Sequence, residues 1–213
     1  MNNFKKKSIL TVAMSSILLA SPVSSAFAAD ENAPFDGAYI GGAAILNKSN
    51  TNASVMPTAS MTLNSKQKAG GGIYGGFGKQ IDMLYLGAEG GFYINRNPGP
   101  TASFGGTVAG LKSKNSIDLS ARAGFVADRA LFYGLAGYTS TNFETIGLAS
   151  KTNNRLNGFR YGGGIEFAVT PEVSLRGEYT HANYQSWDVA SGANTISFDP
   201  SEHRFLVGAS LRF

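Results

Sequence analysis

Residues 202–213 read EHRFLVGASLRF, and hydrophobicity alternates along this stretch with a period of two. One set of alternate positions is apolar throughout: Phe205, Val207, Ala209, Leu211 and Phe213. The other set is mostly small, polar or charged: Arg204, Leu206, Gly208, Ser210 and Arg212. Successive side chains of a β-strand point to opposite faces, so one face suits lipid and the other suits a polar interior. The stretch therefore predicts a strand that crosses a membrane.

The same alternation recurs along the rest of the chain. It gives the eight segments Phe35–Leu46, Gly70–Lys79, Leu84–Asn95, Ser116–Val126, Leu131–Thr141, Gly158–Val169, Val173–Tyr184 and Glu202–Phe213. When tilted, each segment is long enough to cross an apolar band of about 25 Å. After the N-terminal region no apolar run of about 18 residues appears in the sequence, so membrane-spanning helices are excluded.

The connections between these segments alternate between long and short. Long connections lie near residues 47–69, 96–115, 142–157 and 185–201, and short ones at 80–83, 127–130 and 170–172. Outer-membrane barrels have short periplasmic turns and longer external loops, so both ends of the barrel domain are expected in the periplasm. The sequence predicts an all-β fold, an eight-stranded antiparallel up-and-down transmembrane β-barrel. A glycine-rich soluble β-sandwich or fibre subunit is the rival, but its outward faces should be polar.

The N-terminus has the features of an export signal. Lys5, Lys6 and Lys7 precede an apolar run at residues 9–20, which is too short to span a membrane, and a cleavage site ends at Ala28. We expect residues 1–28 to be a signal peptide and residues 29–213 to be the barrel domain. Removing three lysines and no acids lowers the formal charge from +4 to +1, so nucleic acid is not an expected partner. Without cysteine, the chain has no disulfides or thiolate sites.

Charged residues within the segments fall mostly on the inward-facing positions. They are Glu89, Asp118, Arg122, Arg160, Glu166, Arg176, Glu178 and Arg204, with Arg212 at the end of the last segment. An arginine facing lipid near the membrane centre costs about 2 to 4 kcal/mol, which favours inward placement. Because an eight-stranded interior only has room for side chains, we favour a paired network that fills the lumen over a conduction pathway or proton relay. Glu166 and Arg176 flank the turn at Pro171 and should face each other.

The expected external loops are rich in cations. The first three carry Lys48, Lys66, Lys68, Arg96, Lys112, Lys114, Lys151 and Arg155 against Glu144, and the fourth leans acidic through Asp188 and Asp199. Two interpretations remain open for these basic residues. They either keep the loops solvated or attract lipopolysaccharide phosphates and acidic glycans.

Motifs of catalysis and cofactor binding are weak. Gly70, Gly72 and Gly75 satisfy the dinucleotide pattern, but they lie inside a strand pattern rather than between a strand and a helix. His181 and His203 have no clear nucleophile near them in sequence and suit the membrane interface better. We expect no cofactor, no metal site and no enzyme activity, with a membrane-embedded hydrolase as the weakest alternative.

Several stretches resemble the opacity-protein-like or OmpA-like small outer-membrane barrels of Gram-negative bacteria. They are GAYIGG (37–42), LGAEGG (86–91), YGGGIEF (161–167) followed by LRGEY (175–179), and the terminal Phe213. The resemblance implies location in the bacterial outer membrane, among lipid and lipopolysaccharide. It implies a role in envelope support or in surface recognition and adhesion, as in surface antigens that bind a host or glycan ligand through their loops. A narrow porin-like diffusion channel is the alternative. The resemblance also implies that Phe213 is an assembly signal for the barrel assembly machinery.

Overall fold

The computed structural model describes residues 33–55, 59–64, 68–95, 101–104, 107–146, 153–191 and 194–213. The expected signal peptide at residues 1–28 lies outside this range. In the described residues no helix is long and apolar enough to cross a membrane. The main strands are β1 (Gly37–Val55), β3 (Lys68–Ile81), β4 (Leu84–Asn95), β6 (Thr107–Ala127), β7 (Ala130–Ile146), β8 (Asn153–Ala168), β9 (Val173–Tyr184) and β11 (Asn194–Arg212). Three short strands lie between them: β2 (Ala59–Asn64), β5 (Thr101–Phe104) and β10 (Trp187–Ser191).

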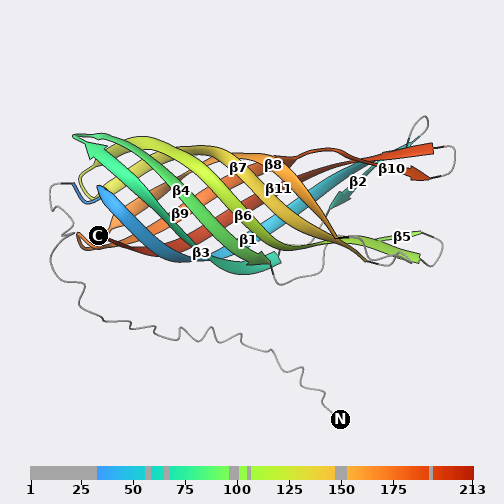
Figure 1. Cartoon of the computed structure of the whole chain (residues 1–213), viewed down its shortest axis with the longest axis horizontal. Helices are drawn as coiled ribbons and strands as arrows, with labels where there is room; N and C mark the ends of the chain where they lie inside the picture. The colour runs from blue at the N-terminus through green and yellow to red at the C-terminus, as the bar shows by residue number, and fades with distance from the viewer. Residues whose placement is uncertain are drawn as a thin grey trace, which may run out of the picture.

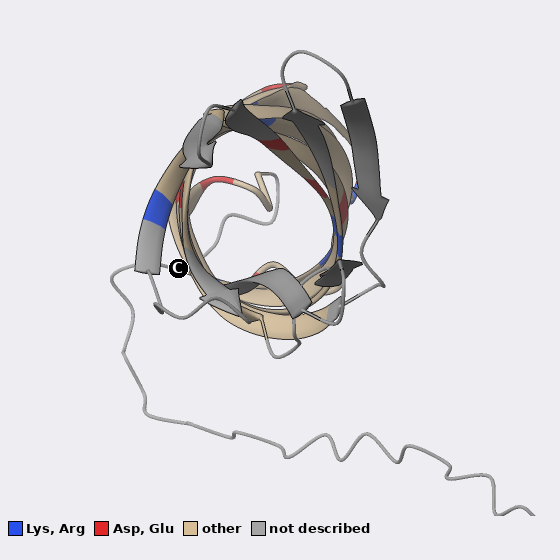
Figure 2. Ribbon diagram, turned by 90° about the vertical axis from the view of Figure 1, so that its right-hand side faces the viewer, with Lys and Arg blue, Asp and Glu red and all other residues tan. Residues whose placement is uncertain are grey.

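The eight main strands form a closed antiparallel barrel (Figure 1). Each pairs with its neighbour in the chain, and β11 also pairs with β1, in a register that sets Tyr39 opposite Arg212. Figure 2, which looks along the barrel, shows the strands closing into a ring. Closure pairs the two strands that would otherwise be sheet edges. The expected eight-stranded up-and-down barrel is therefore confirmed.

The strands differ from expectation in their length on the external side. β4 and β9 have the expected bounds, but β1 continues to Val55, β7 to Ile146, and β6 begins at Thr107. β2, β5 and β10 add hairpins at the same end, on the right of Figure 1. Alternating hydrophobicity marks only the part of a strand that meets lipid, whereas backbone pairing continues beyond it between polar residues. Much of the four long connections, which the sequence suggested were loops, is therefore strand.

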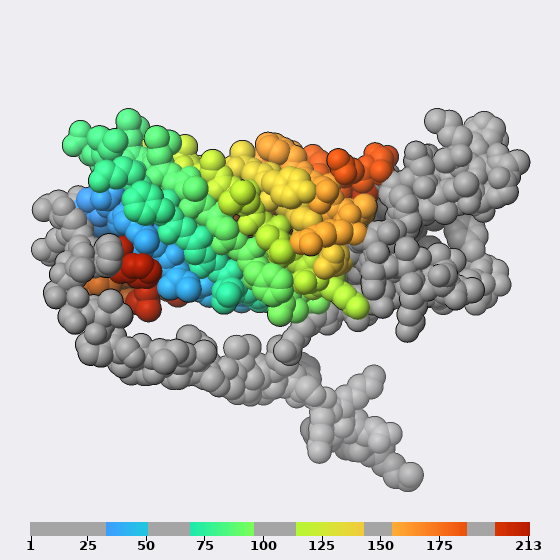
Figure 3. Space-filling view, viewed as in Figure 1, coloured from blue at the N-terminus to red at the C-terminus, as the bar shows by residue number. Residues whose placement is uncertain are grey.

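The wall of the barrel has an apolar outer face. Outward-pointing Leu84, Leu119 and Val207 are among the most exposed side chains, with 63 to 70 % of their surface uncovered. Figure 3 shows the strands crossing this elongated body obliquely, as slanted bands of colour. A belt of exposed aliphatic and aromatic side chains is what a strand presents to lipid hydrocarbon.

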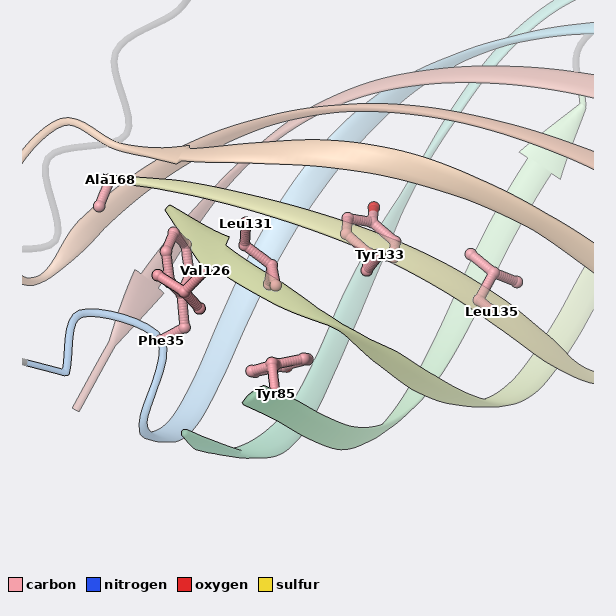
Figure 4. Packing of buried hydrophobic residues seen from close by; sticks show 7 residues of the cluster. All are labelled: Phe35, Tyr85, Val126, Leu131, Tyr133, Leu135 and Ala168. Atoms are coloured by element: carbon pink, nitrogen blue, oxygen red, sulfur yellow. The ribbon is translucent and has the colours of Figure 1, made fainter. Parts of the chain in front are cut away.

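Phe35 closes part of the periplasmic end of the lumen. It was expected to begin the first strand, but β1 starts at Gly37 and Phe35 instead turns inward and is fully buried. Its amide donates to the Gln80 Oε1, and its carbonyl accepts a hydrogen bond from Arg212. It belongs to a buried cluster, shown in Figure 4, with Tyr85, Val126, Leu131, Tyr133, Leu135 and Ala168. A large aromatic ring gains more from this burial than from a place on the strand.

Candidate functional site

The lumen holds two layers of charged side chains, of which the first lies toward the periplasm. This periplasmic-side network consists of Glu89, Arg122, Glu166, Arg176 and Arg212. Both guanidinium Nη atoms of Arg176 contact the Glu89 carboxylate, at 2.5 and 3.0 Å. Arg122 bridges the two carboxylates, with its Nη1 3.3 Å from Glu89 and its Nη2 2.8 Å from Glu166. Arg212 contacts Glu166 at 3.2 Å. Bonds of this kind to charged partners are stronger than neutral ones.

The second layer lies toward the external end. This external-side network consists of Asp118, Arg160, Glu178, Glu202 and Arg204. Asp118 is its centre, because it accepts hydrogen bonds from both Arg160 and Arg204. Thr139 donates a third bond to Asp118. The two networks are connected through Tyr133, whose hydroxyl donates to Glu178 at 2.9 Å and whose ring lies 3.8 Å from the Arg122 guanidinium.

The lumen charges balance. The buried charged residues in the described part of the chain are five arginines and five carboxylates. Tyrosines fill the space between them: the Arg176 guanidinium lies 3.6 Å from the centre of the Tyr74 ring, and the Arg204 guanidinium 4.8 Å from that of Tyr93. Cation–π contacts gain strength where water is excluded. The arrangement can hold the wall together from inside, and its cations and anions satisfy one another.

The structure brings all eight of the expected lumen charges together. The expected register between Glu166 and Arg176 is present, since the two residues are paired across β8 and β9. Their ion-pair partners are different from those we expected: Glu166 contacts Arg122 and Arg212, and Arg176 contacts Glu89. In a narrow barrel a long side chain reaches across the lumen as easily as to its neighbour in the sheet, and sequence parity cannot tell which it does.

Sequence reasoning did not name Glu202 or the lumen tyrosines as members of the network. Glu202 lies two residues before Arg204 on the inward side and contacts it at 3.1 Å. It is the first residue of the predicted last segment and shares the inward parity of Arg204, so the same alternation places it in the lumen. Tyr39 and Tyr74 are buried although tyrosine also suits the lipid interface, so residue type alone did not assign them to the lumen.

Of the eight basic residues expected on external loops, five lie on strands and three lie outside the described residues. Lys48, Lys114 and Arg155 are exposed, but they lie on β1, β6 and β8 rather than on loops. Lys68 and Lys112 are on β3 and β6, and their side chains are outside the described part. Lys66, Arg96 and Lys151 lie outside the described residues altogether. The loop assignment is therefore wrong for five of the eight residues, because pairing of polar strands continues on the external side.

The two ends of the barrel domain meet at the periplasmic rim. Phe213 and Ala38 exchange two backbone hydrogen bonds, of 2.9 and 3.1 Å. Just before β1, the Asp36 carboxylate accepts bonds from the Lys79 ammonium and the Gln80 amide. Partial burial opposes ionisation of Asp36, but these two donors outweigh it and hold the pKa of that carboxyl below its usual value.

Sequence comparison matches most of the chain to one family model. The model, described as "Outer membrane protein beta-barrel domain", covers residues 16–213. Outer membrane protein A of Salmonella typhi is 30 % identical over 156 residues, which are 70 % of this chain and 41 % of that protein. The 22 kDa outer membrane protein of Rhizobium leguminosarum bv. viciae is 26 % identical, over 65 % of this chain and 64 % of that protein. This chain thus matches less than two thirds of the length of either relative.

Two solved structures have a similar fold. Neisserial surface protein A (NspA) superposes with a TM-score of 0.51 and 18 % identity, covering 84 % of this chain and 98 % of that one. The outer membrane protein OprG from Pseudomonas aeruginosa superposes with a TM-score of 0.51 and 10 % identity, covering 84 % and 96 %. At these identities the likeness concerns the fold alone.

Proposed function

The chain belongs to the outer membrane protein beta-barrel domain family, and from this premise we propose that it is a surface protein that binds anionic groups through its external strand extensions. It lies in the bacterial outer membrane. Lipopolysaccharide phosphates are the first ligand we propose, and acidic glycans are the second. We assign it no catalytic role. Residues 1–28 are proposed as its export signal.

The observation that carries this proposal is the exposed basic residues on the external extensions. Lys48, Lys114 and Arg155 lie beyond the apolar belt on three different strands, on the side of the longer connections. Loops and extensions on a rigid scaffold are where binding usually resides. Each exposed contact to a phosphate contributes roughly up to 1 kcal/mol, so several must act together.

The filled lumen supports a surface role over a diffusion channel. Ten buried charged side chains meet across the interior, and most contact partners on other strands. A water-filled path would need these pairs to separate. Breaking a buried pair is costly because it leaves a charge without a partner.

The test measures binding of the refolded protein to purified lipopolysaccharide. The variant replaces six basic residues of the external side with Gln: Lys48, Lys66, Lys68, Lys112, Lys114 and Arg155. Arg129→Gln, exposed at a short turn of the opposite rim, is the control. We expect the six replacements to abolish binding at low salt and the control to retain it. Binding of the parent protein should also fall at 1 M salt, where the screening length shrinks to about 3 Å. Binding that survives the six replacements, or is absent from the parent protein, contradicts the proposal.

A further inference from the structure

The chain has two histidines, and the barrel places them side by side. His181 on β9 and His203 on β11 are directly opposite in register, and both point outward. Lys48 on β1 is the register partner of His203 on its other side. The outward residues from Phe205 on β11 to Phe213 just after it are apolar, so His203 is the first polar position above them. The pair therefore lies at the outer boundary of the apolar belt, where aqueous ions have access.

The ring nitrogens of the pair are close together. The Nδ1 atoms of His181 and His203 are 3.3 Å apart. Zinc binds imidazole nitrogen at about 2.0 to 2.1 Å in tetrahedral geometry, which places two nitrogen ligands about 3.3 to 3.4 Å from each other. The two nitrogens already have the spacing of one edge of such a site.

The neighbours of the pair constrain which nitrogens carry protons. Asn183 Oδ1 lies 2.9 Å from His181 Nε2, and an amide oxygen only accepts, so Nε2 carries the proton and Nδ1 is an acceptor. His203 Nδ1 lies within hydrogen-bond distance of both His181 Nδ1 and the Tyr179 hydroxyl, at 3.3 and 2.7 Å. A proton on His203 Nδ1 bridges the two rings, and a metal bound by both Nδ1 atoms takes the place of that proton, which moves to His203 Nε2.

We propose that His181 and His203 form a binding site for a divalent first-row transition metal, Zn²⁺ or Cu²⁺, with both Nδ1 atoms as ligands. Asn183 orients the His181 ring through its second nitrogen, as outer-shell partners of metal-bound histidines do. The described residues contain no cluster of three or more His, Cys, Asp or Glu side chains that could hold a metal. Two imidazoles therefore supply the protein ligands, and the Tyr179 hydroxyl or water takes the other positions. This site does not rest on the proposed lipopolysaccharide binding.

Lys48 sets the charge around the site. It is exposed and flanks His203 across the seam between β1 and β11. A nearby ammonium repels a divalent cation, although its flexible stem lets it turn away. Replacing Lys48 should strengthen metal binding, whereas the same change would weaken the binding of an anion.

The experiment titrates untagged, refolded protein in detergent with Zn²⁺ by calorimetry, and with Cu²⁺ by electron paramagnetic resonance. We expect one metal per barrel at pH 7.5, nitrogen couplings in the Cu²⁺ spectrum, and loss of binding at pH 5, where protons compete for imidazole. His181→Gln and His203→Gln should each weaken Zn²⁺ binding at least about tenfold, the smallest loss seen even for outer-shell changes. Lys48→Gln should bind Zn²⁺ more tightly than the parent.

Gel mobility before and after heating checks that each variant is folded, and the two histidine variants test the site independently. The proposal is overturned if the parent protein shows no saturable Zn²⁺ binding. It is also overturned if a folded His181→Gln or His203→Gln variant binds Zn²⁺ as the parent does.

Discussion

Each buried arginine of the lumen contacts either two carboxylates or a carboxylate and a tyrosine ring. Glu89 is the clearest case, because it accepts hydrogen bonds from Arg122, Arg176 and the Tyr39 hydroxyl. A carboxylate with three donors is well compensated for the loss of water. If one donor is removed, that compensation fails in the low-dielectric interior.

Arg176→Leu tests this dependence. The change removes both guanidinium contacts to Glu89, and we expect the free energy of unfolding to fall by about 3 to 5 kcal/mol. Urea denaturation in detergent measures the midpoint. Lys79→Met is the control, since it breaks an exposed ion pair to Asp36 and should cost less than about 1 kcal/mol. Equal midpoints for the two variants would show that the network adds no stability.

Asp36 gives the periplasmic rim a dependence on pH. Its pKa is lower in the folded than in the unfolded protein, so its contribution is present above the unfolded pKa and disappears as pH falls through the folded one. We expect the parent protein to lose more stability than Asp36→Asn between pH 6 and pH 2. Urea midpoints of both proteins over that range measure the difference. Parallel curves would exclude a contribution from Asp36.

Close approach between strands explains one run of glycines. A Cβ at Gly162 on β8 would collide with the Tyr179 carbonyl oxygen of β9, whereas a Cβ at Gly177 on β9 would meet nothing within 4 Å. The first contact is with backbone, which cannot turn aside as a side chain can. The barrel wall is therefore tight at Gly162, on the inner side, and open at Gly177, on the outer side.

Gly162→Ala and Gly177→Ala form a matched pair on adjacent strands. We expect Gly162→Ala to destabilise the barrel by about 1 to 3 kcal/mol, the usual range for overpacking, and Gly177→Ala to change little. The urea midpoint and the yield of refolded protein measure both. A lower midpoint for Gly177→Ala than for Gly162→Ala would contradict the close approach.

Phe213 follows β11 and pairs with Ala38 through its backbone. The residue is 47 % exposed. We propose that it acts in assembly, and deleting it should lower the amount of folded protein in the outer membrane. Gel mobility with and without heating measures the folded fraction. Unchanged amounts after the deletion would leave Phe213 without an assembly role.

The strands that meet lipid could be predicted from the sequence, and their polar continuations could not. β4 and β9 were predicted to the residue because short turns bound them at one end and the alternation ends where the strands end. β11 begins eight residues before the expected Glu202, in a stretch without alternation. Inward parity likewise identified Arg122 and Arg176, but their partners depend on how long side chains cross the lumen, which the sequence pattern does not contain.

The balanced lumen bears on transport by the whole barrel. Five buried arginines and five buried carboxylates in the described chain satisfy one another, and Phe35 is packed at the periplasmic end. Ions that enter would have to displace these pairs and a buried ring. We therefore expect that the barrel does not conduct ions.

Planar-bilayer recording of refolded protein checks this expectation. We expect no steady conductance above that of the bilayer, because the lumen charges remain paired. An Arg122→Ala variant, which removes a bridging guanidinium that is fully buried, should show openings if the network is what blocks the path. Steady conductance of the parent protein that responds to lumen substitutions would favour the channel.

Closure of the sheet has a consequence for the timing of folding. Arg212 bonds to the carbonyl of Phe35, 177 residues earlier, and β11 pairs with β1 along its length. Contacts between distant parts of a chain form slowly, because the intervening segment must be brought together first. Until the final strand arrives, any partial sheet has two open edges that can aggregate. The chain must therefore be kept from pairing with other copies until β11 has paired with β1.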